Sequence, residues 1–310
     1  MRIAVIGAGG VGGLYGGLLA KAGHDVGFLA RGEHLRAIQR RGLEIRSAEF
    51  GTFTVDGPAS DNTADLGQAE LVLFAVKTYD LDDASQLARQ LLGPDGNLLT
   101  FQNGLDAPDL LAEVVGGEHV MIGTTGLETT IREPGVIGHL SKFHYVFVGA
   151  LHGPATPRVN QVVEVLRDAR INATAVADGH RALWEKASVQ VPMATITSVC
   201  RAPIGAIREL PETYRLIEAL LDEVAAVARA HGYDMPEARR RAQDTIDNWA
   251  YDGKASMARD FERGNRTELE AITGALVRLA DSKGVDVPVS RTAYALLKLR
   301  QQLVQAEKAD

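Results

Sequence analysis

The 310-residue chain has a single cysteine, Cys200, which excludes an intrachain disulfide. Proteins without disulfides are typical of reducing compartments, so we expect a cytoplasmic protein. The apolar residues Ile196 and Val199 beside Cys200 indicate a small buried side chain rather than a reactive thiol.

An excess of basic charge is also missing, because 33 Lys and Arg stand against 40 Asp and Glu and give a net charge of -7. Binding to phosphate backbones needs a basic face, so nucleic acid is excluded as a main partner. The run Arg239-Arg240-Arg241 lies in a polar helical pattern and predicts a solvated helix face. No window reaches the roughly eighteen apolar residues of a membrane span, and we expect no membrane partner.

The eight histidines form no H-x-x-x-H or comparable ligand pattern, so the sequence predicts no metal site. His139 and His144 fall in a predicted β region and are interpreted as surface residues. No serine or cysteine lies in a recognisable nucleophile elbow, which leaves nucleophilic catalysis unsupported.

The first half of the chain alternates short apolar runs with helical patterns. This alternation predicts an α/β fold, a Rossmann-type doubly wound parallel sheet with helices on both faces. The expected strands are Arg2–Ile6, Val26–Leu29, Leu71–Val76, Leu98–Phe101 and Val120–Gly123. The expected helices span residues 12–22, 33–41, 79–92 and 106–115.

Residues 127–150 change to a pattern of antiparallel strands, which we expect to close one edge of this sheet. A helix near 155–169 and a short strand at 173–177 complete the domain. From about residue 180 only helical spacing remains, with stop signals at Gly232, Gly253 and Gly284. The prediction is a nucleotide-binding domain over 1–178 and an all-α domain over 179–310.

The turn after the first strand fits the pattern G-x-G-x-x-G, written here Gly7-Ala8-Gly9-Gly10-Val11-Gly12. It follows a strand and opens a helix, which is the context of a dinucleotide-binding turn. In that reading the first glycine permits the tight turn, the second lets a pyrophosphate approach, and the third lets the helix pack on the strand. The helix N-terminus would then offer N–H donors to the phosphates.

The end of the second strand indicates which dinucleotide. An NAD enzyme usually carries Asp or Glu there for the ribose 2′-hydroxyl, whereas this chain has Phe28-Leu29-Ala30-Arg31. The Arg31 guanidinium suits a 2′-phosphate, so the sequence predicts NADP(H). The alternative is an ordinary surface arginine in a turn.

Lys77 and Asn103 each follow a predicted strand directly. Ligands of open α/β sheets bind outside the carboxyl ends of the strands, so both side chains are candidates to contact cofactor or substrate. Each also has the simpler interpretation of a turn residue.

With these residues in hand, the chain resembles the ketopantoate reductase family (2-dehydropantoate 2-reductases) from end to end. The matching segments are GAGGVG, Arg31, VK at Lys77, QNG at Asn103, WEK at Lys186, ASM at Ser256 and RTELEAITG at Glu268. The resemblance implies a Rossmann domain joined to a helical domain and a reaction in which NADPH reduces the substrate.

The resemblance also implies roles for individual residues. Lys186 matches the general acid, and Glu268 the acidic residue that works beside it. Ser256 matches a contact to the substrate carboxylate, and Asn103 and Lys77 match residues near the nicotinamide. Independently, hydride delivery to a ketone leaves negative charge on oxygen, which a positioned ammonium both stabilises and protonates.

Each of these residues has a structural alternative. Lys186 could reach solvent from the start of a helix. Thr267 and Glu270 form a T-x-x-E capping box, in which Glu268 would only favour the helix dipole. Ser256 could be a helix cap.

The expected substrate pocket departs from the family pattern, which has asparagines four and eight residues after its lysine. Gln190 and Ala194 stand there, so one amide is longer and the other is lost. Pro192 is expected to interrupt and bend the helix. The segment 141–149 also lacks glycines common in the family. Losing a hydrogen-bonding partner should relax the preference for a hydroxylated substrate.

We therefore expect NADPH-dependent reduction of a 2-keto acid, with 2-dehydropantoate (ketopantoate) reduced to pantoate in pantothenate biosynthesis. One alternative is a related reductase of a less polar 2-oxo acid, and another is a non-catalytic NADP(H) sensor. A homodimer is possible, with Leu296 and Leu299 either in the core or at an interface.

Overall fold

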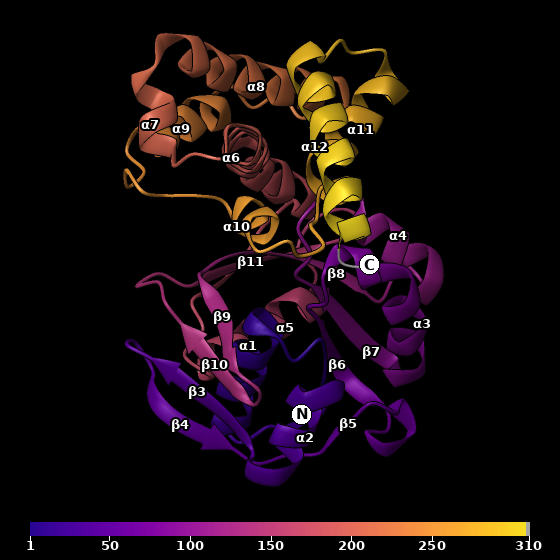
Figure 1. Ribbon diagram of the computed structural model, residues 1–310. Coiled ribbons are helices and arrows are strands. Elements are labelled where there is room, and N and C mark those ends of the chain that lie inside the picture. The colour runs from indigo at the N-terminus through magenta and orange to yellow at the C-terminus, as the bar shows by residue number, and fades with distance from the viewer. Residues whose placement is uncertain (308–310) are drawn as a thin grey trace. The chain divides into compact units, whose positions relative to one another are not determined.

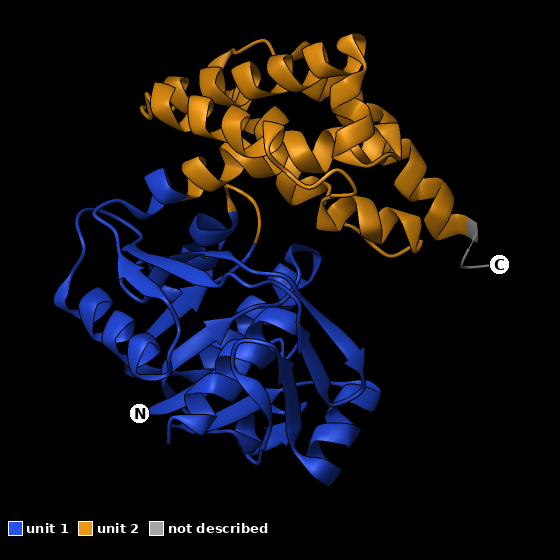
Figure 2. Cartoon of the chain, turned by 90° about the vertical axis from the view of Figure 1, so that its left-hand side faces the viewer, with its two compact units in different colours: residues 1–102, 107–182 blue, residues 103–106, 183–310 orange. Residues whose placement is uncertain are grey.

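The computed structural model describes residues 1–307. The chain divides into two compact units (Figure 2). Residues 1–102 and 107–182 form the first unit, and residues 103–106 belong with the chain from Leu183 onward in the second. Asn103–Asp106 therefore packs with the C-terminal half, whereas the residues on either side of it belong to the first unit.

An eight-stranded sheet forms the first unit, in the order β12-β11-β8-β7-β6-β1-β2-β5 (Figure 1). The strands are β1 (Arg2–Ile6), β2 (Asp25–Leu29), β5 (Ala59–Ser60), β6 (Ala69–Phe74), β7 (Leu92–Thr100), β8 (Val120–Gly126), β11 (Tyr145–Ala150) and β12 (Ala173–Ala175). The strands from β5 to β8 are parallel, whereas β11 runs antiparallel to β8 and parallel to β12. The predicted doubly wound sheet with antiparallel edge strands is confirmed.

Helices connect these strands and cover both faces of the sheet. They are α1 (Gly10–Lys21), α2 (Gly32–Arg41), α3 (Leu81–Leu91), α4 (Ala107–Val115) and α5 (Pro157–Asp168), with 3₁₀ turns η1 (Thr63–Asp65) and η2 (Thr78–Asp80). In Figure 1, α1 and α5 lie on one face, and α3 and α4 lie on the other. Central strands covered on both faces need apolar residues at every position, and Ile3, Ala4, Val5 and Ile6 of β1 are all buried.

A second, four-stranded sheet corrects the prediction for residues 127–150. Its order is β4-β3-β10-β9, with β3 (Leu43–Ser47), β4 (Gly51–Val55), β9 (Thr129–Glu133) and β10 (Val136–His139). Only β11 extends the main sheet, because β10 pairs in parallel with β3 instead. Neither β3 nor β4 was predicted from the sequence.

Helix α1 packs on the main sheet with one face and on the small sheet with another. A Cβ atom added at Gly13 would lie 2.8 Å from Ile137 Cγ1, and one at Gly17 would lie 3.0 Å from Ile45 Cγ1. The backbone of α1 can approach the small sheet this closely only because those positions lack side chains. The glycines that continue beyond the G-x-G-x-x-G turn are thereby explained by packing.

His139 lies in the small sheet and is 4% exposed, so its interpretation as a surface residue was wrong. Its Nδ1 lies 2.9 Å from Ser47 Oγ and its Nε2 lies 3.2 Å from Ser141 Oγ. The Phe50 ring stacks against the His139 imidazole and contacts that of His144 edge-on. Burial lowers the pKa of His139, which the Phe143 carbonyl opposes and the neighbouring His144 reinforces.

The second unit is helical, as predicted. Its elements are α6 (Gly179–Cys200), which starts in the last residues of the first unit, α7 (Ile204–Glu209), α8 (Pro211–Ala230), α9 (Pro236–Asp247), α10 (Ser256–Glu262), the π-helical η3 (Glu270–Gly274), α11 (Ala275–Lys283) and α12 (Pro288–Glu307). Gly284 ends α11 in the left-handed conformation at φ 65°, and Pro288 begins α12. Pro192 does not interrupt α6, which runs continuously from Gly179 to Cys200.

A buried carboxylate from α8 caps the start of α12. Glu223 is 8% exposed, and its two oxygens accept from the N–H groups of Val289 and Ser290, each at 2.8 Å. These donors belong to the first turn, where a helix has no intrahelical partners for its N–H groups. The same negative charge also lies favourably at the positive end of the helix dipole.

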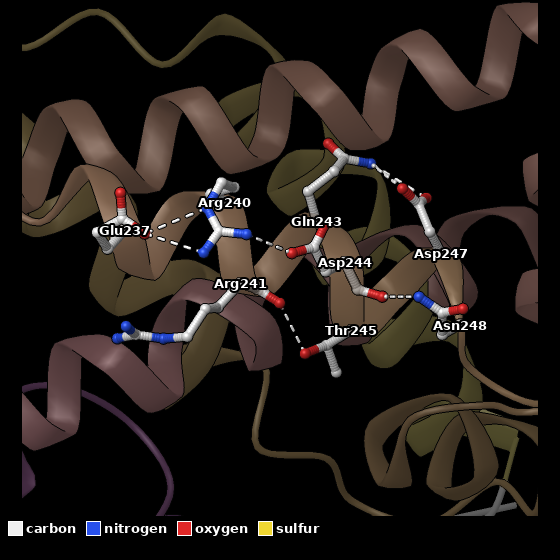
Figure 3. A network of polar contacts seen from close by, with 8 residues as sticks. All are labelled: Glu237, Arg240, Arg241, Gln243, Asp244, Thr245, Asp247 and Asn248. Atoms are coloured by element: carbon white, nitrogen blue, oxygen red, sulfur yellow. Dashed lines mark hydrogen bonds and ion pairs between the residues drawn. The ribbon is translucent and has the colours of Figure 1, made fainter.

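The arginine run of α9 is a solvated face, as the sequence indicated. Arg240 binds Glu237 and Asp244 on its own helix (Figure 3). Arg239 pairs with Asp222 at 2.8 Å, and Arg241 lies 3.6 Å from Glu185. Each guanidinium is thus balanced by a carboxylate, and the run offers no unneutralised basic patch.

Candidate functional site

The glycine-rich turn after β1 has the backbone that its sequence predicts. Gly7 adopts φ +90°, and a Cβ there would lie 2.8 Å from Val76 N. A Cβ at Gly12 would lie 2.3 Å from the Gly7 carbonyl oxygen. Gly7 is therefore required by the turn, and Gly12 by the close packing of α1 against it.

Gly9 is different, because a Cβ there would meet no protein atom within 4 Å. Packing does not explain this glycine, whereas close approach of a ligand to the backbone would. Gly9 is also the N-cap of α1 and supplies no side-chain cap for the first N–H groups of the helix. An uncapped N-terminus behind a bare backbone fits a bound pyrophosphate.

Two polar side chains hold this edge of the sheet and were not singled out from the sequence. His34 Nε2 bonds the Ala8 carbonyl at 2.8 Å, and its Nδ1 accepts from Gly135 N at 3.0 Å. Burial lowers the pKa of His34, which favours the neutral ring that this pairing requires. Gln102 is 5% exposed and donates to the Phe74 and Val76 carbonyls, each at 3.1 Å. A lone histidine and glutamine give no sequence signal for such supporting roles.

Lys77 directly follows this supported backbone. It is the N-cap of η2, and its carbonyl accepts from Asp80 N at 2.9 Å. The residues just before it, Ala75 and Val76, are those that approach Gly7. Lys77 thus leaves the sheet next to the glycine-rich turn.

Arg31 lies at the end of β2 and is the N-cap of α2. Its side chain is 82% exposed, and Nη2 lies 2.7 Å from Asp80 Oδ2. No carboxylate stands at the end of β2 itself, but η2, which follows β6 on the other side of β1, brings one to Arg31. No local sequence pattern predicts this partner, which lies 49 residues away.

In the second unit, three candidate residues meet in one hydrogen-bonded chain. Lys186 Nζ donates to Asn103 Oδ1 at 3.0 Å, and Asn103 Nδ2 donates to Glu268 Oε2 at 3.1 Å. The Asn103 amide therefore links the ammonium to the carboxylate. Lys186 comes from the second turn of α6, whereas Glu268 comes from the segment just before η3.

The surroundings favour a lysine that releases its proton readily. Burial lowers the pKa of Lys186 to about 8, and the nearby negative charge of Glu268 partly opposes this shift. Glu268 itself is 4% exposed. The arrangement supplies an ammonium whose pKa lies close to physiological pH, as suits a general acid.

The backbone next to Glu268 is a π-turn rather than a capped α-helix. Gly274 N bonds the Leu269 carbonyl five residues back at 2.9 Å. The predicted capping box is wrong, because the Glu270 carboxylate accepts from Tyr294 Oη at 2.7 Å instead of reaching back to Thr267. A π-turn of this kind is frequent at functional sites.

A buried hydroxyl pair joins α6 to the π-turn. Thr195 Oγ1 and Thr273 Oγ1 are 2.8 Å apart, and both residues are fully buried. Thr195 is on the helix that carries Lys186, and Thr273 is in the turn that follows Glu268. The pair therefore fixes the two functional segments relative to each other.

The remaining substrate candidates occupy different environments. Gln190 is half-buried one turn after Lys186, whereas Ala194 is 1% exposed and buried. Ser256 is exposed and is the first residue of α10, whose N-cap is Ala255, so the alternative of a Ser256 cap is wrong. The Ala255 N–H lies 3.4 Å from Thr197 Oγ1, which brings the start of α10 to the same helix α6.

Among residues 1–307, no group of three or more His, Cys, Asp or Glu side chains is arranged to hold a metal ion. Within the same range, no helix is both long and apolar enough to cross a membrane.

A doubly wound sheet with a glycine-rich turn, together with a half-buried lysine linked to a carboxylate, is typical of a two-unit oxidoreductase. The ketopantoate reductase PanE/ApbA family model matches residues 3–153, and the model of the C-terminal part of that family matches residues 178–301. The chain belongs to the ketopantoate reductase family and is an oxidoreductase acting on CH–OH groups.

Similar proteins extend over the same length. The 2-dehydropantoate 2-reductase of Halobacterium salinarum is 34% identical over 310 residues, covering 97% of this chain and 99% of its own. That of Archaeoglobus fulgidus is 32% identical over 304 residues, covering 96% and 97%. The crystal structure of a PanE/ApbA family ketopantoate reductase from Ralstonia eutropha JMP134 superposes with a TM-score of 0.90 at 28% identity, covering 98% of this chain and all of that one.

Proposed function

We propose that this protein uses NADPH to reduce 2-dehydropantoate to pantoate, the step that serves pantothenate biosynthesis. The observation that carries the proposal is the chain Lys186–Asn103–Glu268, with Lys186 near pKa 8. The reductases of Halobacterium and Archaeoglobus, which match 97% and 96% of the chain, support the choice of substrate.

The proposed catalytic residues act on the carbonyl oxygen. Reduction at the carbonyl carbon leaves negative charge on this oxygen, and the Lys186 ammonium stabilises that charge and donates the proton. Asn103 holds Lys186 in place by accepting a hydrogen bond from its ammonium, while the negative charge of Glu268 partly opposes the lowering of the Lys186 pKa by burial. Bound NADPH would supply the hydride.

Binding of NADPH is proposed for the glycine-rich turn. Gly7, Gly9 and Gly12 would let the pyrophosphate reach the N-terminus of α1, together with Ala8, Gly10 and Val11 of the same turn. Arg31 would bind the 2′-phosphate, and Lys77 and Asn103 would lie toward the nicotinamide.

Substrate binding is proposed for Lys186, Asn103, Glu268, Gln190 and Ser256. The Gln190 amide is one turn from the proton donor and would hydrogen-bond the substrate, and Ser256 would bind its carboxylate. Ala194 supplies no polar group, which supports the alternative of a less polar 2-oxo acid on the same machinery. A non-catalytic sensor, the other alternative, would not need a lysine with a lowered pKa.

The test is NADPH oxidation by the purified protein with ketopantoate and with 2-oxo acids that lack its terminal hydroxyl. We expect ketopantoate to turn over fastest, and Lys186→Ala to lower kcat by at least about a hundredfold. NADPH affinity should stay within about twofold, as for the exposed control Lys283→Ala. Faster turnover of the other acids would select the alternative substrate, and no turnover of any acid would select the sensor.

Three further expectations remain predictions: a functional division at residue 178, a cytoplasmic location and a homodimer. Leu296, Leu299 and Leu303 of α12 are each more than half exposed, so they are not core residues. They leave an apolar stripe on one face of this helix.

A further inference from the structure

The ion pair between Arg31 and Asp80 lies where the ribose end of a dinucleotide is read. Arg31 follows β2 and Asp80 follows β6, and these two strands flank β1, which ends in the glycine-rich turn. All three segments leave the carboxyl edge of the parallel sheet. The pair therefore lies beside the proposed nucleotide site rather than elsewhere on the surface.

Asp80 is held in this place by its own turn. Its N–H bonds the Lys77 carbonyl at 2.9 Å, and its side chain is 28% exposed. The Arg31 side chain, in contrast, is 82% exposed and meets Asp80 through one nitrogen at 2.7 Å. The carboxylate is thus the more buried member of the pair, and the guanidinium is the more exposed one.

The two groups favour different dinucleotides. A guanidinium attracts the 2′-phosphate of NADPH, whereas a carboxylate accepts a hydrogen bond from the 2′-hydroxyl of NADH and repels a phosphate. With Asp80 beside it, Arg31 offers a phosphate a nearly neutral pair instead of a lone positive charge.

We propose that Asp80 is a specificity-determining residue that weakens the preference for NADPH and lets the protein bind NADH as well. This inference rests on the proposed dinucleotide site. In this proposal the residue that discriminates NADPH from NADH follows β6, whereas the usual determinant follows β2.

The test compares dissociation constants of NADPH and NADH, without substrate, for the wild type and two variants. Asp80→Asn keeps the shape of the side chain and removes its charge. Asp83→Asn is the matched control, because it removes the same charge from the exposed first turn of α3. Binding is followed by calorimetry and by nicotinamide fluorescence, in low salt and in about 0.5 M salt.

Asp80→Asn should raise the preference for NADPH over NADH about tenfold in low salt, and less at high salt, because one unit charge near a phosphate is removed. Asp83→Asn should change it by less than about twofold. An unchanged ratio in Asp80→Asn would overturn the inference while leaving the reductase function intact. A selective loss of NADPH binding would also overturn it, since Asp80 would then serve to position Arg31 for the phosphate. Failure of the wild type to bind either dinucleotide would overturn both proposals.

Discussion

The lowered pKa of Lys186 predicts an early loss of activity at alkaline pH. The ammonium donates the proton in the proposed reaction, so only the protonated enzyme reduces the carbonyl. An ordinary lysine stays charged to about pH 10, whereas burial brings the pKa of Lys186 to about 8. We therefore expect kcat/KM to be flat at neutral pH and to fall tenfold for each pH unit above about 8.

The size of the effect follows from that value. At pH 9.5 about 3% of the enzyme would retain the Lys186 proton, compared with about 90% for a lysine with an unshifted pKa of 10.5. Glu268 raises the pKa of Lys186, so Glu268→Gln should move the alkaline limb to lower pH. The glutamine keeps an oxygen that can accept from Asn103, and the change therefore removes mainly the charge.

The assay is kcat/KM for the keto acid measured from pH 6 to about pH 10.5 at saturating NADPH, in the wild type and in Glu268→Gln. The pH profile of each protein is normalised to its own plateau value of kcat/KM. A shift in pKa is thereby distinguished from a general loss of rate. A wild-type plateau that extends to about pH 10 would refute the role of burial. A limb that moves to higher pH in Glu268→Gln would refute the electrostatic coupling between the two residues.

Three further perturbations test the fold around the site. Glu223→Gln should lower the free energy of unfolding by about 1–3 kcal/mol in chemical denaturation, because a carboxylate that accepts two N–H groups of α12 becomes an amide with a single acceptor. The pKa of His139 is lowered from 6.5, so the folded state loses stability as pH falls below that value, and His139→Gln should flatten this part of the curve of thermal stability against pH. Thr273→Val should cost about 1–3 kcal/mol, since it leaves the hydroxyl of Thr195 buried and unpaired, and the double variant Thr195→Val/Thr273→Val should recover most of the loss.

Strands buried on both faces could be predicted from the sequence, because their apolar runs are continuous. The observed limits of β1 agree with the expected Arg2–Ile6. The strands β3 and β4 were missed, since LEIRS and GTFTV are partly exposed and carry polar residues on one face. β3 pairs with β4 in a local hairpin and on its other edge with β10, about ninety residues later, and no local pattern contains the second pairing.

The candidate site shows the same division between local and distant information. Arg31 and the glycine-rich turn could be found locally, because the G-x-G-x-x-G spacing fixes where the second strand ends. Asp80 could not be assigned to Arg31, since an ion pair across two loops depends on the order of the strands. The hydrogen bond between Thr195 and Thr273 could not be predicted either, because isolated threonines in helical segments carry no signal that distinguishes them from other threonines.

The position of the proposed proton donor, Lys186, depends on a short segment that belongs to the second unit although the residues on either side of it belong to the first. Gly104 adopts φ +108°, and a Cβ there would lie 2.5 Å from the Ala271 carbonyl oxygen in the π-turn. Arg278 of α11 holds the same segment by donating to Asp106 at 2.7 Å. The glycine after Asn103 therefore has a physical reason, since only a residue without a side chain brings this backbone against the turn that follows Glu268. That contact places the Asn103 amide between Lys186 and Glu268, so the QNG motif, besides following a strand, positions the proposed general acid.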